Sequence, residues 1–457
     1  MSETLAQRFA RYSVELDYSR IPQPVIHETK RRFIDSFATA VGAMDSDAFA
    51  IARKCAGRVQ SNPGASLLAG GKSSIEWATF VNGLAIRYLD FNDTYLSLEP
   101  AHPSDNLAAV LSVGEAYGSS GKEMLAAGVL AYEIQCRLCD AASLRKHGVD
   151  HVTYGALSSC LAACKLMKLD ATKTAHAVGL AGVCNVALRQ TRAGEMSMWK
   201  GCAFANAARN GVFAALLAAD GLTGPAPIFE GELGLEKLII REKVNVAPMG
   251  AEAGNSDGFM MSKTYIKFWP VEYHAQSAVD AILQLRPQIG DWRDVDKIDI
   301  HTFDAAVDII GKDPEKYRPK TRETADHSMP YCVAVALVDG DVGLRSFDDN
   351  RLADESLIKL TNQVKLHRDA DCNRRYPKGI PNRLTVTMKD GKQHVKEVEF
   401  PRGHAGNPMT DTEVETKFRK VVEPVYGKEV ADRVLAACWK FEELKTAADV
   451  VKLFDRK

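Results

Sequence analysis

Residues 201–225, GCAFANAARNGVFAALLAADGLTGP, indicate the fold class of this 457-residue chain most directly. The stretch is dense in Ala and Gly, and its apolar residues recur at the spacing of an α-helix. Small residues on a helix face allow a neighbouring helix to approach closely. Gly221 follows the apolar run and indicates where the helix ends. The stretch therefore predicts a helix packed closely among other helices.

Helical periodicity continues on both sides of this stretch, from residue 1 to about residue 265. Apolar residues repeat every three or four positions in four further windows, residues 21–44, 73–93, 120–142 and 171–188. Pro22 and Pro24 stand near the start of the first window, where helices tolerate proline. No fixed-period repeat is visible, which argues against a solenoid. We expect a large all-helical domain.

The pattern changes after this point. Residues 295–310, VDKIDIHTFDAAVDII, predict a strand that runs into a helix. Residues 383–400, RLTVTMKDGKQHVKEVEF, alternate on both sides of an Asp390-Gly391 turn, which is typical of a β-hairpin. The predicted fold class is mainly α, with a large all-helical domain and a smaller α+β domain. The expected bounds are residues 1–266 with C-terminal helices in 405–457 for the first domain, and 267–404 for the second.

Composition excludes several classes of protein. Hydrophobic residues make up 46% and charged residues 26%, as in globular proteins, which argues against a disordered or collagen-like chain. The net charge is -1, whereas proteins of nucleic acids or membrane surfaces carry a basic excess. No stretch approaches the roughly 20 apolar residues of a membrane span, and no secretion signal opens the chain. We expect a cytoplasmic protein without nucleic-acid or membrane partners.

Ten cysteines are spread along the chain. The pairs Cys136-x2-Cys139 and Cys160-x3-Cys164 both occur in apolar helical windows. Metal sites usually combine such a spacing with a second Cys or His pair, and none follows either one. We therefore expect buried core thiols, no metal site and no iron–sulfur cluster.

Residues 87–116, RYLDFNDTYLSLEPAHPSDNLAAVLSVGEA, are the most informative stretch for function. An apolar helix ends there in a group of polar side chains, Asp90, Asp93 and Thr94. A loop follows and leads to His102 at the start of the next helix. The N-terminus of a helix favours an anion and a neutral imidazole. A structural interpretation is also open, in which the carboxylates are helix caps and His102 is an ordinary loop residue.

The predicted start of that second helix depends on two polar residues. Ser104 or Asp105 is expected to be the N-cap, with Pro103 just outside the helix.

Basic residues recur in similar settings elsewhere. His151 and Lys200 each stand just before a helical window, and Lys267 and His274 lie where the pattern changes. A lone lysine is usually a solvated surface group. If these residues face one pocket, two lysines and two histidines suit a di- or tricarboxylate ligand. Nucleotide-binding, zinc-protease and serine-hydrolase motifs are absent from the sequence.

The sequence resembles the MmgE/PrpD family, the family of 2-methylcitrate dehydratase. The resemblance covers nearly the whole chain and rests on RYLDFNDTY…HPSDNL, GVDHV, SMWKGCAFANAARNGVFAALLA, YHAQSAVDA, HSMPYCVAVAL and FPRGHAGNPMTD. It implies a helical domain with most of the site, an α+β lid, homodimers, and catalysis without a metal or organic cofactor. Members dehydrate 2-methylcitrate to 2-methyl-cis-aconitate. Relatives include cis-aconitate decarboxylase and an epimerase of a dicarboxylic imine.

The resemblance also implies which residues form the site. The family's site residues correspond to Asp90, Thr94, His102, His151, Lys200, Lys267 and Tyr331. We add Asp93 and His274 as substrate-binding candidates. The long loop from Thr94 to His102 is similar to that of the dehydratases. The HSMPYC and SMWKG segments differ from the best-known bacterial dehydratases, which leaves the exact substrate open.

The expected reaction removes a proton α to a carboxylate and expels a β-hydroxyl as water. Lys200 and Lys267 would hold the carboxylate as negative charge develops. The two histidines would be the acid and the base, in an order that the sequence leaves open, and Tyr331 could replace either. Asp90 would orient a histidine, and Thr94 would bind a substrate oxygen. Two alternatives remain: a decarboxylase with the same cationic pocket, and a non-catalytic di- or tricarboxylate-binding protein.

Overall fold

The computed structural model describes residues 3–194 and 196–456, and the chain divides into two compact units. Unit 1 comprises Met1–Arg192, Met198–Thr264 and Thr410–Lys457, and unit 2 comprises Ala193–Ser197 and Tyr265–Met409. The short segment Ala193–Ser197 is thus assigned to unit 2, although the residues on both sides of it in the sequence belong to unit 1. The C-terminal helices belong to unit 1.

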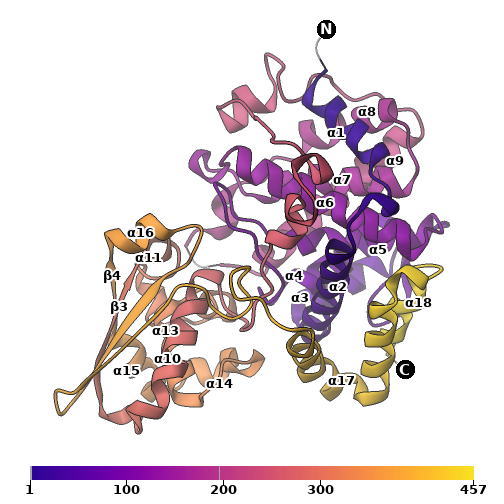
Figure 1. Ribbon diagram of the computed structural model, residues 1–457. Coiled ribbons are helices and arrows are strands. Elements are labelled where there is room, and N and C mark those ends of the chain that lie inside the picture. The colour runs from indigo at the N-terminus through magenta and orange to yellow at the C-terminus, as the bar shows by residue number, and fades with distance from the viewer. Residues whose placement is uncertain (1–2, 195, 457) are drawn as a thin grey trace. The chain divides into compact units, whose positions relative to one another are not determined.

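Unit 1 is a bundle of helices around a core of apolar side chains (Figure 1). Its helices are α1 (Leu5–Glu15), α2 (Gln23–Ala43), α3 (Asp47–Ala56), α4 (Ile75–Arg87), α5 (Leu107–Ala116), α6 (Gly121–Ala141), α7 (Val152–Leu166), α8 (Ala171–Cys184), α9 (Trp199–Ala219), α17 (Asp411–Trp439) and α18 (Ala448–Val451). The strands β1 (Ala65–Ser66) and β2 (Lys72–Ser73) form a short antiparallel pair, which is a small departure from the all-helical expectation. Helix α7 packs on α6 and α9, and α17 packs on α2.

Glycine sets the close approach of α7 and α9, as the Ala- and Gly-rich sequence predicts. A Cβ atom at Gly211 would lie 2.3 Å from the carbonyl oxygen of Ala156. A Cβ atom at Gly155 would lie 2.3 Å from Cε2 of Phe204. Larger residues at either position would push the two helices apart.

Helix α9 corrects one expectation from the sequence. By length and composition it is apolar enough to cross a membrane, whereas no such stretch was expected. Within the structure 61% of its most apolar window is buried among the other helices, which is the position of a core helix.

The prediction of helix as far as about residue 265 is wrong for residues 220–264. This segment forms turns, a π-helical turn at Glu236–Ile240 and three 3-10 turns. Pro225, Pro227 and several glycines interrupt it, and both residue types disfavour a continuous helix.

A four-stranded sheet is the centre of unit 2. Its strands are β3 (Val295–Thr302), β4 (Val364–Arg368), β5 (Asn382–Met388) and β6 (Gln393–Val398). They lie in the order β4-β3-β5-β6, with β3 parallel to β4 and antiparallel to β5. The predicted hairpin is confirmed, because β5 and β6 pair across the Asp390-Gly391 turn. Gly391 has a φ of 87°, a conformation that glycine adopts at no steric cost.

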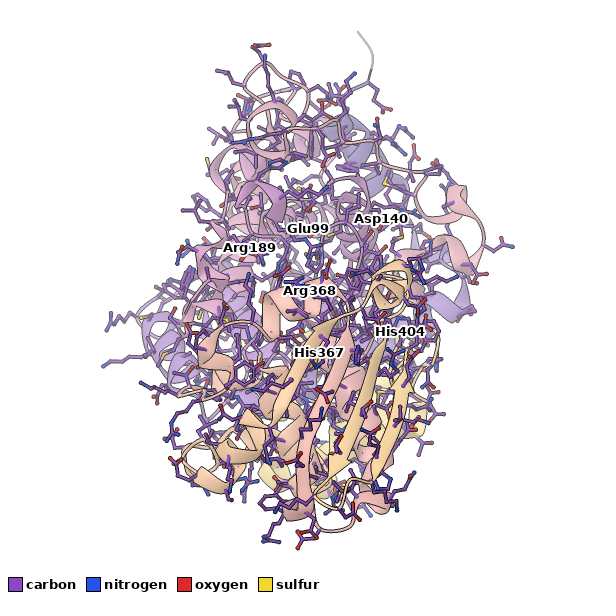
Figure 2. The ribbon with its side chains drawn as sticks, turned by 90° about the vertical axis from the view of Figure 1, so that its left-hand side faces the viewer. Glu99, Asp140, Arg189, His367, Arg368 and His404 are labelled. Carbon is purple, nitrogen blue, oxygen red and sulfur yellow. The ribbon has the colours of Figure 1, made fainter. Side chains whose placement is uncertain are left out.

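Helices line one face of this sheet. They include α10 (Gln276–Ile289), α13 (Met329–Asp339) and α15 (Glu355–Asn362). Shorter helices complete the unit: α11 (Asp304–Ile310), α12 (Arg322–Ala325), α14 (Asp349–Leu352) and α16 (Ala370–Arg375). Figure 2 shows the opposite face of the sheet turned to the viewer, with His367 and Arg368 at its β4 edge. Buried and partly exposed residues alternate along β5, as expected for a sheet covered on one face.

Candidate active site

The loop between α4 and α5 folds back so that His102 lies near Asp90. Asp90 adopts a left-handed conformation with a φ of 52°, which Asp tolerates better than most residues. Farther along, Tyr95 and Ala101 exchange two backbone hydrogen bonds of 2.8 and 2.9 Å. This pairing closes the loop and returns the chain to the end of α4.

The structure corrects the expected cap of the helix that follows. A 3-10 turn, Pro103–Asn106, comes first with His102 at its N-cap, and α5 begins only at Leu107. Ser104 and Asp105 therefore lie inside the turn. Asn92 Nδ2 donates to Ser104 Oγ at 2.8 Å and to Asp105 Oδ1 at 2.7 Å. These side chains tie the loop to the turn and do not cap α5.

Protein groups fix the orientation of the His102 ring. Its Nδ1 lies 2.7 Å from the backbone oxygen of Asp93 and 3.2 Å from Thr94 Oγ1. A carbonyl oxygen can only accept, so Nδ1 carries a hydrogen and Nε2 is the nitrogen that can exchange a proton. Nε2 lies 3.8 Å from Asp90 Oδ1, and Arg87 forms an ion pair with the same carboxylate.

Asp93 holds the loop in place through its buried carboxylate. Its carboxylate is fully buried and accepts hydrogen bonds from Ser104 N at 2.9 Å and from Tyr132 OH at 2.7 Å. Arg32 Nε lies 3.6 Å away. Through these contacts Asp93 positions the loop around His102, and its role in substrate binding stays a prediction.

His151 stands at the N-cap of α7, next to His102. The centroids of the two imidazole rings are 5.9 Å apart. His151 Nδ1 lies 3.0 Å from Asp150 Oδ1, and Arg192 Nε donates to Asp150 Oδ2 at 2.8 Å. His151 Nε2 is buried and has no hydrogen-bond partner among the described residues.

Burial and neighbouring charges determine the protonation states of His151 and Asp150. Burial, together with nearby arginines, lowers the pKa of His151 to about 3, against the opposing effect of Asp150. Burial alone would raise the pKa of Asp150, but Arg192 and His151 hold it below its usual value. Near neutral pH the pair is therefore a carboxylate and a neutral imidazole, with the Nε2 lone pair able to accept a proton.

The neutral His151 predicts a pH dependence of stability. Between about pH 6.5 and about pH 3 the unfolded chain binds a proton at this residue and the folded chain does not, so stability rises with pH across this window. Acidification from about pH 7 to about pH 5 should cost wild-type protein about 2 kcal/mol more than a His151→Gln variant. Urea unfolding of both proteins at the two pH values measures the difference. Parallel pH dependences would contradict a neutral buried His151.

Lys200 lies in the first turn of α9 and is almost fully buried. The following residue shows how close this turn comes to the end of α4. A Cβ atom at Gly201 would lie 2.6 Å from the ring of Tyr88 and 3.1 Å from its Cα. Lys200 is thus held at the helix start that packs against the end of α4.

The other basic candidates belong to unit 2. Lys267 is fully buried. His274 Nδ1 lies 2.9 Å from Glu272 Oε1, and its Nε2 lies 3.3 Å from the hydroxyl of Tyr376. Burial would raise the pKa of Glu272, but His274, His327 and Lys267 lower it to about 2. Both nitrogens of His274 thus contact protein groups.

Tyr331 lies in the core of unit 2. Its side chain is fully buried, and its hydroxyl donates to the backbone oxygen of Ser346 at 2.8 Å. Burial raises the pKa of this hydroxyl. Because its hydrogen is held by a backbone acceptor, the mechanism proposed below does not use Tyr331 as a proton donor.

The four cysteines of the two spaced pairs are buried, as predicted. All ten cysteines are free, and Cys136, Cys139, Cys160 and Cys164 are completely buried. Within residues 3–194 and 196–456, no three or more His, Cys, Asp or Glu side chains are grouped so that they could hold a metal ion.

Comparison with known proteins identifies the family. The MmgE/PrpD N-terminal domain matches residues 7–246, and the MmgE/PrpD C-terminal domain matches residues 269–441. The chain belongs to the MmgE/PrpD family. This confirms the resemblance seen in the sequence motifs.

Named relatives of this MmgE/PrpD chain include dehydratases. The 2-methylcitrate dehydratase of Cupriavidus necator is 31% identical over 354 residues, which cover 72% of this chain and 70% of the relative. That of Escherichia coli K12 is 30% identical over 352 residues, covering 72% and 71%. The alkylcitrate dehydratase phiI of a fungal species is 30% identical over 380 residues, covering 76% and 73%.

The candidate site contains further groups that are not among the residues predicted from the sequence. Asp150 and Arg192 hold His151, and Arg87 holds Asp90. Burial raises the pKa of Asp105 to about 8, although Arg87 lies 3.6 Å away. The Asp-His pair in GVDHV was a visible sign of the first contact.

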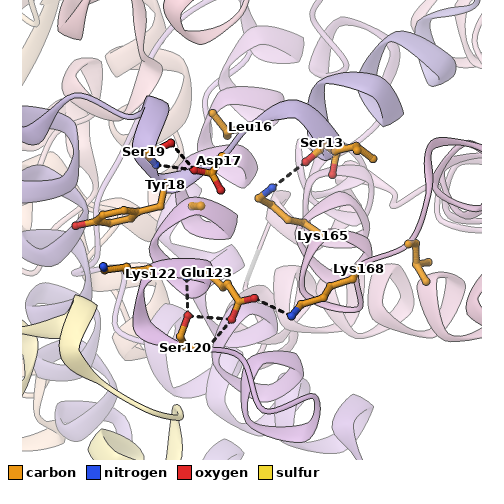
Figure 3. Close-up of a pocket in the computed structure, with 13 residues that line it drawn as sticks. Ser13, Leu16, Asp17, Tyr18, Ser19, Ser120, Lys122, Glu123, Lys165 and Lys168 are labelled. Atoms are coloured by element: carbon orange, nitrogen blue, oxygen red, sulfur yellow. Dashed lines mark hydrogen bonds and ion pairs between the residues drawn. The ribbon is translucent and has the colours of Figure 1, made fainter.

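A separate pocket lies at the other end of α7 (Figure 3). Its volume is about 660 Å³, and it contains none of the candidate residues. Its lysines contact protein groups: Lys168 Nζ lies 3.0 Å from Glu123 Oε1, and Lys165 Nζ donates to the backbone oxygen of Ser13 at 2.9 Å. Along α7 it is about 20 Å from His151, given a rise of about 1.5 Å per residue.

Proposed function

We propose that the chain dehydrates 2-methylcitrate, or a closely related hydroxy-tricarboxylate, to the corresponding 2-methyl-cis-aconitate without a metal ion. The observation that carries the proposal is the pair of neighbouring histidines, His102 and His151, each with a protein oxygen within 3.0 Å of its Nδ1. Elimination of water needs a base for the α-proton and an acid for the leaving hydroxyl. The dehydratase relatives support this reaction class.

The different surroundings of the two rings support different roles. His151 is neutral and presents its Nε2 lone pair, so we assign it as the base that takes the α-proton. His102 has the carboxylate of Asp90 3.8 Å from Nε2, which stabilises a positively charged ring. We assign it as the acid that gives its Nε2 proton to the departing hydroxide and so forms water. Each turnover leaves a proton on His151 and removes one from His102, and solvent exchange restores both.

Lys200 is assigned to the substrate carboxylate whose α-proton is removed. A buried ammonium group at a helix start offers fixed positive charge together with the positive end of the helix dipole. Thr94 is assigned first to orienting His102, which it contacts at 3.2 Å. The roles of Lys267 and His274 in substrate binding and the homodimer stay predictions.

Product analysis tests the proposed reaction. Protein treated with a metal chelator is incubated separately with 2-methylcitrate stereoisomers, citrate and cis-aconitate, and products are followed by NMR with parallel trapping of carbon dioxide. We expect an unsaturated tricarboxylate from a 2-methylcitrate isomer and no carbon dioxide. Carbon dioxide from cis-aconitate, without any dehydration, would instead identify a decarboxylase. Ligand binding without any product would identify a non-catalytic binding protein.

A further inference from the structure

Arg192 carries a hydrogen-bond donor that the described protein leaves unused. Its Nε donates to Asp150 at 2.8 Å, whereas its Nη2 is buried and has no hydrogen-bond partner among the described residues. The same carboxylate holds His151, whose Nε2 is also buried and unpartnered. The side chains of His151 and Arg192 are only 7% and 15% exposed.

Such an arrangement points to a ligand. Buried polar atoms in proteins are nearly always hydrogen-bonded, so two unpartnered atoms on one carboxylate need an explanation. One atom is a guanidinium N–H, which can only donate, and the other is an imidazole lone pair, which accepts. A carboxylic acid ligand suits both atoms. Its carboxylate can accept the hydrogen bond from Arg192 Nη2, and its adjacent C–H proton can be taken by His151 Nε2.

Three arginines lie close enough to this point to act on the charge of His151, against the opposing effect of Asp150. Arg87, Arg189 and Arg192 all act on His151 to lower its pKa. Burial lowers the pKa of Arg189, and the negative charge of Glu99 opposes this effect. Both residues are labelled in Figure 2. Glu99 is itself held by Ser143 Oγ and the backbone N–H of Arg145. Each of these arginines also has a carboxylate nearby, so the unpartnered Nη2 donor, and not net charge, indicates an anionic ligand.

We propose that Arg192 binds a carboxylate of the substrate through Nη2, beside His151 Nε2, and so selects tricarboxylates over dicarboxylates. This inference rests on the proposed function for the identity of the substrate. A guanidinium is suited to this task because its planar fork can bind Asp150 and a second carboxylate at the same time.

Arg192 also positions Asp150, so a test must separate the two roles. Three inert acids allow this separation: tricarballylate, and the two dicarboxylates that lack its central or one terminal carboxylate, glutarate and methylsuccinate. None carries a hydroxyl group that could leave as water, so binding is measured without turnover. Isothermal titration calorimetry gives Kd for each acid.

The expected result is a loss that depends on the ligand. Arg192→Gln should weaken tricarballylate binding by about 10- to 100-fold, as expected for a hydrogen bond between charged groups. The variant should also lose the preference for tricarballylate over one of the two dicarboxylates. Arg192→Lys should lose less, because it keeps the charge, and it replaces the Gln variant if that protein does not fold. The control is Arg419→Gln, which removes an arginine paired with carboxylates on the surface of the same unit.

Other outcomes would overturn the inference. An equal loss for all three acids would mean that Arg192 only positions Asp150, and unchanged binding would mean that it contacts no ligand. Absence of binding by the wild-type protein would also contradict a tricarboxylate site. If Arg192→Gln abolishes the preference in a protein that dehydrates nothing, the inference stands and the proposed function fails.

Discussion

Replacing His102 with alanine is expected to lower kcat by about 10²- to 10⁴-fold, the usual contribution of a general acid. The reason is that Nε2 is the nitrogen that can exchange a proton, while Nδ1 is held by the backbone oxygen of Asp93 at 2.7 Å. The fold should survive, because the network beneath the ring, from Asp93 to Tyr132 and Ser104, does not include the imidazole. Steady-state kinetics with the preferred 2-methylcitrate isomer measure the effect.

His367→Ala is the matched control. This histidine lies on the open face of the sheet in unit 2, is 45% exposed and pairs with Asp299 (Figure 2). Its removal should leave kcat unchanged. A folded His102→Ala protein with wild-type kcat would refute the assignment of His102 as the acid.

Replacing Lys417 with methionine is expected to lower the free energy of unfolding by about 3–5 kcal/mol, as is typical when one partner of a buried ion pair is removed. Lys417 Nζ lies 2.6 Å from Asp35 Oδ1, and both side chains are buried. The same ammonium group donates to the backbone oxygen of Phe91 at 2.8 Å and lies 3.7 Å from the centre of the Phe91 ring. Without it, an uncompensated carboxylate would remain in the core.

Urea unfolding near neutral pH measures this loss, and two further variants interpret it. Lys428→Met removes an exposed lysine from the second part of α17, after the break at Gly427, and should be nearly neutral. Asp35→Leu combined with Lys417→Met should recover much of the stability, because apolar replacement of a buried pair is often tolerated. If the single Lys417 variant were as stable as wild type, the ion pair would not be an important support of the loop at Phe91.

Much of the fold was predictable because its signals are local. The Asp-Gly turn between alternating residues predicted the hairpin of β5 and β6, and apolar spacing predicted the helices of unit 1. Residues 220–264 were expected to be part of the helical domain, but their prolines and glycines interrupt a helix. The capping residue of α5 was mispredicted because Ser104 and Asp105 bond to Asn92, a partner that propensity rules do not anticipate.

The site shows the same division between local and distant contacts. His102 and His151 stand at the starts of helical turns, and this could be seen in their immediate sequence. Arg192 is 42 residues from Asp150, and Lys417 is 326 residues from Phe91. Such contacts exist only once the helices have packed, so a single sequence gives no indication of them.

The most direct test of the central claim is the ultraviolet absorbance of chelator-treated protein mixed with 2-methylcitrate, because dehydration creates a double bond conjugated to a carboxylate. We expect a steady rise in absorbance with one stereoisomer, undiminished by the chelator and abolished in a His102→Ala/His151→Ala protein. No rise with any stereoisomer, in wild-type protein that still binds tricarballylate, would contradict this claim.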